Sequence, residues 1–159
     1  MISYINSTPA VYPDLIKLAL TDEPRYSWRA AWLLWSVMET DDKRLRKHLQ
    51  KIAAILPERN ESHQRELIII LQKMNLPDDI TSQLFDYCTT LWNDPSRTLS
   101  LRYNAFKLMA KIAQEYPELI PELKMLAVND NQAGLPRSLR RCADKILRGS
   151  YNAGDKQSL

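Results

Sequence analysis

Apolar side chains recur at helical spacing along most of the chain, as Leu45, Leu49, Ile52 and Leu56 illustrate. Polar breaks that mostly contain proline separate the short apolar stretches: DEPR, LPERNE, LPDD, NDPSR, YPEL and DNQAGLPR. Glycine occurs only three times, always in the last quarter of the chain, whereas a sheet protein with tight hairpins needs more. The pattern predicts an all-α protein of about eight short helices.

Four segments of the chain repeat one another: YSWRAAWLLW, SHQRELIIIL, SLRYNAFKLM and SLRRCADKIL. Their alignment places Arg29, Arg65, Arg102 and Arg140 at equivalent positions, separated by 36, 37 and 38 residues. The third and sixth residues after each arginine are apolar and share one helical face; they are Trp32 and Trp35, Ile68 and Leu71, Ala105 and Leu108, and Ala143 and Ile146. Near the start of each segment a serine can cap the helix: Ser27, Ser62, Ser100 and Ser138.

Another apolar stripe precedes each repeated segment, so each unit is predicted to be a helical hairpin. A hairpin of this kind buries its apolar faces only by stacking on neighbouring hairpins. We therefore predict an α-α superhelix, or solenoid, of four hairpins in a single domain. The expected boundaries are a lead-in at 1–11, a domain at 12–148 with units near 12–42, 43–79, 80–118 and 119–148, and a flexible tail at 149–159.

The repeated unit resembles the HEAT and HEAT-like repeat family, in which an aspartate follows the first helix and an apolar residue followed by arginine opens the second. The matching residues are Asp22 with Trp28-Arg29, Asp94 with Leu101-Arg102, and Asp130 with Leu139-Arg140. The second unit has Glu58 and Gln64 at these positions, and the units are shorter than the roughly 40 to 47 residues of HEAT and armadillo repeats. The resemblance covers about residues 12 to 147 and implies a HEAT-like solenoid.

The closing segment PELKMLAVNDNQAGLPRSLRRCADKIL is similar to that of small bacterial HEAT-like proteins, some of which carry the label adenylosuccinate lyase. That enzyme family is a much larger helical protein with a serine-rich catalytic loop and catalytic histidines. The chain has no such loop. The resemblance therefore implies a bacterial repeat protein without lyase activity.

Trp28, Trp32 and Trp35 lie at i, i+4 and i+7 of one predicted helix. Such a cluster is typical either of a platform that stacks nucleic-acid bases or of a buried helix face. Because the equivalent positions of the other units hold mostly leucine, isoleucine and alanine, we expect the three tryptophans to be in or near the core.

The repeated arginines are expected to be structural. We predict that they pair with the aspartates of the units and satisfy backbone carbonyls between units. This Asp/Arg ladder comprises Asp22, Arg29, Arg65, Asp94, Arg102, Asp130 and Arg140.

The formal net charge of +3 is unevenly distributed, because residues 1–42 are net acidic whereas residues 43–79 and 119–159 are net basic. Two rows of cations, each on one predicted helical face, are candidate partner contacts: Lys43, Lys47 and Lys51, and Arg137, Arg141, Lys145 and Arg148. Rows of this kind are typical of solvated outer faces. They are also what contact with nucleic-acid phosphates requires.

Phosphate contact would relate the chain to the alkylpurine DNA glycosylases, a HEAT-like branch that cradles duplex DNA and places aromatic and acidic residues beside the damaged nucleotide. The chain is shorter and less basic than these enzymes. Its paired aspartates at 41–42 and 78–79 lie at predicted helix junctions, where carboxylates cap helices without doing chemistry. We expect no glycosylase activity.

The sequence contains no Cys-x-x-Cys, no H-E-x-x-H and no glycine-rich phosphate loop, so we expect no metal, no cofactor and no catalysis. His48 and His63 are expected at the surface, and Cys88 and Cys142 as reduced, buried side chains. The longest apolar run, at 67–71, is too short to cross a bilayer, and the N-terminal residues lack a secretory signal. We therefore expect a cytoplasmic protein that does not contact membranes.

The function expected from these patterns is noncatalytic binding of a protein or peptide along a groove formed by the second helices. The acidic first unit is predicted to dock a basic partner segment through Asp22, Glu23, Glu39, Asp41 and Asp42. The alternative is a nucleic-acid-binding protein that uses the basic C-terminal unit. We expect a monomer or a weak homodimer.

Overall fold

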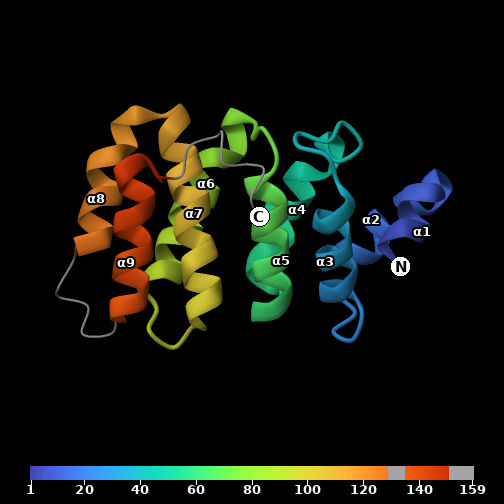
Figure 1. Ribbon diagram of the computed structural model, residues 1–159, viewed down its shortest axis with the longest axis horizontal. Coiled ribbons are helices and arrows are strands. Elements are labelled where there is room, and N and C mark those ends of the chain that lie inside the picture. The colour runs from blue at the N-terminus through green and yellow to red at the C-terminus, as the bar shows by residue number, and fades with distance from the viewer. Residues whose placement is uncertain (129–134, 151–159) are drawn as a thin grey trace. The chain divides into compact units, whose positions relative to one another are not determined.

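The computed structural model describes residues 1–128 and 135–150. These residues form nine α-helices and no strand, which confirms the all-α prediction (Figure 1). The helix beyond the expected eight is α1 (Ile2–Ser7), which lies in the predicted lead-in. The chain divides into two compact units, Met1–Leu84 and Phe85–Leu159.

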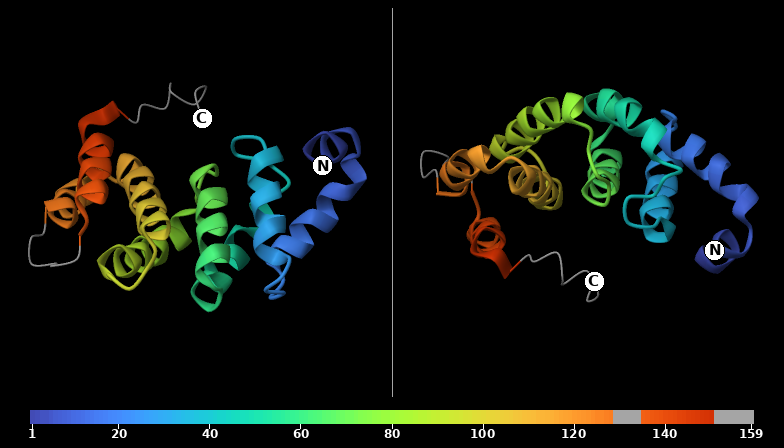
Figure 2. Two further views of the ribbon diagram at one scale, coloured as in Figure 1. Left: turned by 60° about the horizontal axis from the view of Figure 1, so that its bottom comes forward. Right: turned by 90° about the horizontal axis from the view of Figure 1, so that it is seen from above.

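The first unit consists of helical hairpins, as predicted. It contains α1, α2 (Tyr12–Leu20), α3 (Ser27–Val37), α4 (Leu49–Ile55), α5 (Glu61–Gln72) and the start of α6 (Asp78–Asn93). Helix α3 packs against both α2 and α5. Helices α2 and α4 form one layer, and α3 and α5 form the other (Figure 2).

The second unit continues the alternation of helices. It contains the end of α6, α7 (Leu99–Glu115), α8 (Ile120–Val128) and α9 (Arg137–Lys145), and α7 packs against both α8 and α9. The Trp92 and Phe106 rings meet in its core with centroids 4.6 Å apart. The indole Nε1 of Trp92 donates to the Leu126 carbonyl at 3.0 Å, which ties α6 to α8.

Short 3-10 turns join or extend the helices at Pro9–Val11, Arg46–His48, Leu56–Glu58 and Pro117–Leu119. After α9 the backbone continues as a π-helical turn, Ile146–Ser150, in which Gly149 takes a positive φ of 74° that suits glycine. The predicted flexible tail lies mostly at 151–159, outside the described residues.

Two helices are capped by residues that lie just ahead of the serines expected to cap them. The Asn60 side chain accepts from the His63 amide at 3.0 Å and caps α5, and the Thr98 hydroxyl accepts from the Leu101 amide at 3.4 Å and caps α7. Ser27 lies inside α3, where its hydroxyl accepts from the Glu23 amide at 2.9 Å and fixes the preceding turn. The serine pattern therefore located the helices to within one turn.

His63 is buried, with 2% of its surface exposed, so the expectation of a surface histidine was wrong. Its Nε2 lies 2.7 Å from the Ala19 carbonyl, close to the end of α2, which makes the histidine a bridge between α5 and α2. Burial lowers the pKa of His63 below the ordinary value of 6.5, although the bond to Ala19 partly opposes this shift. His48 is half-buried, and burial also lowers its pKa.

We expect acidification below pH 6.5 to destabilise the fold through His63. In that range the unfolded chain takes up a proton that the buried imidazole resists, so the free energy of unfolding falls with pH until the folded pKa is passed. Thermal melts between pH 7.5 and 5 should show a smaller decline for His63→Gln than for the parent protein. His48→Gln is the control for the second histidine, and equal declines in the parent and His63→Gln would contradict this account.

Candidate functional site

Helix α3 presents two chemically different faces. Ala30, Ala31 and Leu34 are buried, and the two alanines allow neighbouring helices to approach closely. The tryptophans lie on an adjacent face of the helix. Trp32 is 42% exposed, and Trp28 and Trp35 are half-buried.

The prediction that all three tryptophans are in or near the core is therefore wrong for Trp32. The equivalent residues Ile68, Ala105 and Ala143 are buried, as the alignment implied. The eleven-residue α3 packs beside α5. On the side away from α5, α3 itself is flanked only by the six-residue α1. The short α1 cannot cover a face that a full helix would bury.

This face of α3 is the floor of an open groove of about 840 Å³ in the first unit. The groove lies across α3 between α1 and α5, and it is lined by Met1, Ile2, Ser3, Trp28, Arg29, Trp32, Leu33, Arg65 and Glu66. Most of this lining is aromatic or aliphatic, with two guanidinium groups and one carboxylate. Apolar walls with a few polar groups are the usual composition of a recognition site.

A buried carboxylate organises the side of the groove formed by α5. Glu66 is 2% exposed, and its Oε2 accepts from Trp35 Nε1 at 2.6 Å. Its Oε1 accepts from Arg65 Nε at 2.9 Å and from Arg65 Nη2 at 2.6 Å. The charge of Glu66 is thus balanced within the protein, and the network fixes the orientation of Trp35.

The tryptophans and Arg29 form a connected aromatic surface. The Trp32 and Trp35 rings meet edge to face, with centroids 6.3 Å apart and planes at 82°. The Arg29 guanidinium lies 5.2 Å from the centroid of the Trp28 ring, which is cation–π distance. Arg29 is exposed and, within 1–128 and 135–150, forms no ion pair.

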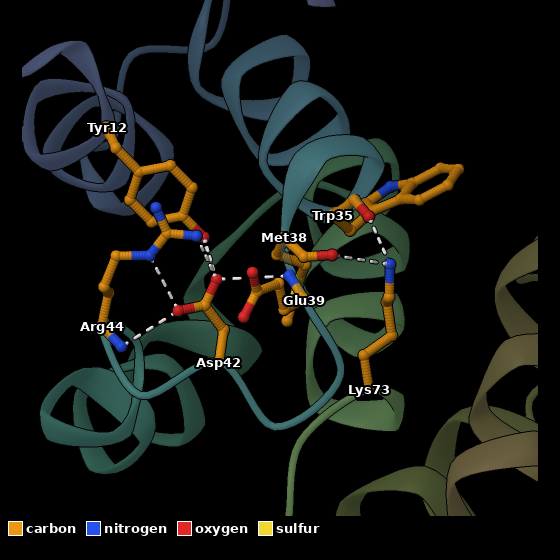
Figure 3. Close-up of polar contacts among 7 residues, drawn as sticks. All are labelled: Tyr12, Trp35, Met38, Glu39, Asp42, Arg44 and Lys73. Carbon is orange, nitrogen blue, oxygen red and sulfur yellow. Dashed lines mark hydrogen bonds and ion pairs between the residues drawn. The ribbon is translucent and has the colours of Figure 1, made fainter. Parts of the chain in front are cut away.

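The loop after α3 is fixed by a second polar cluster (Figure 3). The Asp42 carboxylate accepts from the Tyr12 hydroxyl at 2.9 Å and from Arg44 Nε and Nη2 at 2.9 and 2.7 Å. The amides of Glu39 and Arg44 also donate to it. Lys73 Nζ donates to the Trp35 carbonyl at 2.7 Å, which ties the end of α3 to the end of α5.

These contacts shift the ionisation of the cluster. Burial alone would raise the pKa of Asp42, but the hydrogen bonds from Arg44 and Tyr12 outweigh it and hold that pKa well below its ordinary range. Burial, together with the Asp42 carboxylate, raises the pKa of Tyr12 well above its ordinary range. Asp42 is therefore charged, and Tyr12 neutral, at all physiological pH values.

The expectation that Asp42 contacts a partner was wrong, because the residue is only 3% exposed and its oxygens are occupied. Asp41 is also engaged, since it pairs with Arg46 and accepts from the Asn75 amide at 3.2 Å. Its φ of 50° is stabilised by the bond from its own amide to the Lys73 carbonyl at 2.8 Å. Both aspartates therefore fix the loop rather than present a free acidic surface.

The aligned arginines share a sequence position but have different partners. Arg29 lies over Trp28, Arg65 pairs with Glu66, and Arg102 Nε donates to the Trp92 carbonyl at 2.9 Å. The predicted partner Asp22 lies 3.8 Å from Arg59 instead of pairing with Arg29, and Asp94 accepts from Arg97 at 2.9 Å. Arg140 is exposed, and Asp130 lies outside the described residues. The Asp22–Arg29 rung of the predicted ladder does not form, because α3 directs Arg29 to the groove.

The two predicted rows of cations are exposed. Only Lys51 lies in α4, because Lys47 is in the 3-10 turn before it and Lys43 is in the preceding loop. The first row is therefore not the continuous helical face expected. The second row is helical: Arg137, Arg141 and Lys145 lie on α9, and Arg148 lies in the turn after it. Contact of either row with a partner stays a prediction.

The sequence drew attention to the tryptophans and Arg29, although as core and ladder residues, and it predicted a groove along the second helices. It missed Glu66 and the contribution of α1 to the lining. Glu66 follows an aligned arginine, and nothing in its spacing distinguishes it from a surface glutamate. The alanine pair at 30–31 was an available signal. It forms the buried stripe of α3 with Leu34, so the tryptophans belong to a different face. Cys88 is buried as expected, and Cys142 is half-buried.

The described part of the chain contains no group of three or more His, Cys, Asp or Glu side chains placed to hold a metal ion. None of its helices is long and apolar enough to cross a membrane. A family model described as HEAT repeat domain matches residues 1–150. No curated protein and no solved structure matches the chain.

Proposed function

Since the chain belongs to the HEAT repeat domain family, we propose that it is a noncatalytic binding module that holds a protein or peptide segment in the groove on α3. The observation that carries this proposal is the exposure of Trp32 on a helix that buries another face, formed by Ala30, Ala31 and Leu34. Tryptophan is the residue type most enriched at binding hot spots, because its large ring gains much from losing contact with water.

The surroundings of α3 support recognition by a preformed surface. Trp35 is fixed by Glu66, and the carbonyl of Trp35 is fixed by Lys73. The loop after α3 is held by the Asp42 cluster. A partner therefore binds without the entropic cost of ordering the aromatic surface.

The narrower likeness to small bacterial HEAT-like proteins that carry the label adenylosuccinate lyase adds no chemistry to this proposal. The carboxylate of the groove, Glu66, has both oxygens occupied by donors from the protein itself. A carboxylate that acts as a general acid or base must reach the substrate. The groove is therefore suited to binding rather than to acid–base catalysis.

A Trp32→Ala variant should retain its fold and lose partner binding. Peptides selected from a random display library on the full chain are expected to bind Trp32→Ala about thirtyfold more weakly, the loss that a 2 kcal/mol hot spot produces. Isothermal titration with the selected peptides measures this ratio.

The matched control is Tyr26→Ala, which removes an exposed aromatic ring just before α3 that does not line the groove. Its affinity should equal that of the parent chain. Circular dichroism melts establish that both variants are folded. Selected peptides that bind Trp32→Ala as tightly as the parent would contradict a binding site on this face.

The alternative function, nucleic-acid binding, is favoured by the exposed row Arg137, Arg141, Lys145 and Arg148. If these four cations neutralise four duplex phosphates, the logarithm of the binding constant should fall against the logarithm of salt with a slope of about −3.6. Anisotropy with labelled duplex DNA measures the slope. Exchange of Arg141 and Lys145 for glutamate should flatten it, whereas absence of binding at low salt would exclude this function.

A further inference from the structure

The charged side chains of the groove offer hydrogen-bond donors to a ligand, whereas their carboxylate, Glu66, is buried and accepts bonds from the protein. Glu66 is the only carboxylate among the described lining residues, and both of its oxygens accept bonds from Trp35 and Arg65. Arg65 uses Nε and Nη2 for Glu66, and Arg29 forms no ion pair within the described residues. The charge of Glu66 balances that of one guanidinium group, so one positive side-chain charge of the lining remains unbalanced.

The apolar part of the groove lies beside these donors. Trp32 is adjacent to Leu33, and Ile2 of α1 is also partly exposed there. This floor suits a large apolar or aromatic side chain, which would bury the exposed part of the Trp32 ring. The groove is open to solvent, so a segment of a larger protein can reach it.

We propose that the partner held in this groove is an acidic protein segment, in which an aspartate or glutamate lies next to a large apolar residue. The side-chain carboxylate binds the guanidinium groups of Arg29 and Arg65, and the apolar side chain packs on Trp32. This inference rests on the proposed peptide-binding function and adds the chemistry of the partner. It differs from the expectation of a basic partner, which relied on Asp22, Glu23, Glu39, Asp41 and Asp42.

The position of Arg29 favours a carboxylate in particular. Its guanidinium lies over the Trp28 ring, which restricts the side chain, and within the described residues it forms no ion pair that would occupy its N–H groups. A planar guanidinium held in this way donates two parallel hydrogen bonds to a carboxylate. A ligand at this point therefore gains charge-assisted bonds with little loss of side-chain entropy.

A cationic ligand is the opposite possibility, because perpendicular aromatic rings such as Trp32 and Trp35 can surround an ammonium group. Such a site also needs a carboxylate that is free to balance the charge of the cation. Here Glu66 is already paired and a face of Trp28 is covered by Arg29. The two guanidinium groups would also repel the ligand.

The test uses the full chain and short labelled peptides with both ends blocked, so that only side chains carry charge. The first peptide contains aspartates beside a phenylalanine, the second has asparagine for each aspartate, and the third and fourth carry lysine or trimethyllysine there. Fluorescence anisotropy at low salt should show binding of the acidic peptide that is at least about tenfold tighter than that of the asparagine peptide.

Arg29→Gln should weaken binding of the acidic peptide more than binding of the asparagine peptide, because the charge-assisted part of the contact is lost only with the acidic peptide. Arg25→Gln is the matched control, because Arg25 is exposed shortly before α3 and does not line the groove. Equal or tighter binding of the asparagine, lysine or trimethyllysine peptide would overturn the acidic-partner inference but leave the groove as a binding site. Absence of binding by all four peptides, or binding that neither Arg29→Gln nor Trp32→Ala changes, would overturn both proposals.

Discussion

An Arg102→Ala variant is expected to be less stable than the parent protein by about 3 kcal/mol, the combined effect of a lost charge-assisted hydrogen bond and lost packing. Arg102 is 1% exposed, and its Nε donates to the Trp92 carbonyl in the last turn of α6. Its guanidinium also lies 5.9 Å from the centroid of the Trp92 ring. Truncation leaves the Trp92 carbonyl without this donor and creates a cavity inside the second unit.

Urea denaturation followed by circular dichroism measures this loss in the free energy of unfolding. The control is Arg140→Ala, which truncates an arginine at the same repeat position that is exposed. Its effect should stay within about 0.5 kcal/mol, as for most surface substitutions. Similar losses in both variants would show that the repeat position, rather than burial, determines the contribution of the arginine.

Asp42→Ala is the second variant with a large expected effect. It should lower the free energy of unfolding by about 3 kcal/mol, because removal of one partner leaves a buried polar cluster unsatisfied. The Tyr12 hydroxyl, the Glu39 amide and the Arg44 side chain all donate to Asp42. Tyr12→Phe removes only one of these bonds and should cost about 1 kcal/mol. Lys43→Ala, at an exposed neighbouring position, should be nearly neutral.

The contribution of Asp42 also depends on pH in a defined direction. Its folded pKa lies below the ordinary value of 3.8, so its stabilisation is fully present above that value and is lost as pH falls through the folded pKa. The difference in unfolding free energy between the parent and Asp42→Asn should therefore shrink in strong acid. A difference that is constant from pH 6 to pH 2 would contradict the charged state assigned to Asp42.

The hairpin units could be predicted from sequence because equivalent positions are buried in successive units. The third residue after each aligned arginine is buried at Ile68, Ala105 and Ala143, and the alignment of these positions located α5, α7 and α9. The exception is Trp32, where the same position faces solvent. Periodicity predicts which residues share a face, but not whether a neighbouring helix is long enough to cover that face.

The polar contacts could not be predicted in the same way, because they depend on pairs that are distant in sequence. Trp35 is 31 residues from Glu66, and Tyr12 is 30 residues from Asp42. His63 illustrates the same limit, since its bond to the Ala19 carbonyl spans 44 residues and reverses its expected exposure. A repeat pattern places helices, whereas the side-chain partners depend on the packing between them.

The groove on α3 as a binding surface is tested most directly by following the indole N–H resonances of the four tryptophans in proton–nitrogen NMR spectra. On addition of the acidic aromatic peptide, the resonances of Trp28 and Trp32 should shift saturably. Trp92, buried in the second unit, should not respond. Unchanged Trp28 and Trp32 resonances at saturating peptide, or a shift confined to Trp92, would contradict the assignment of the binding site.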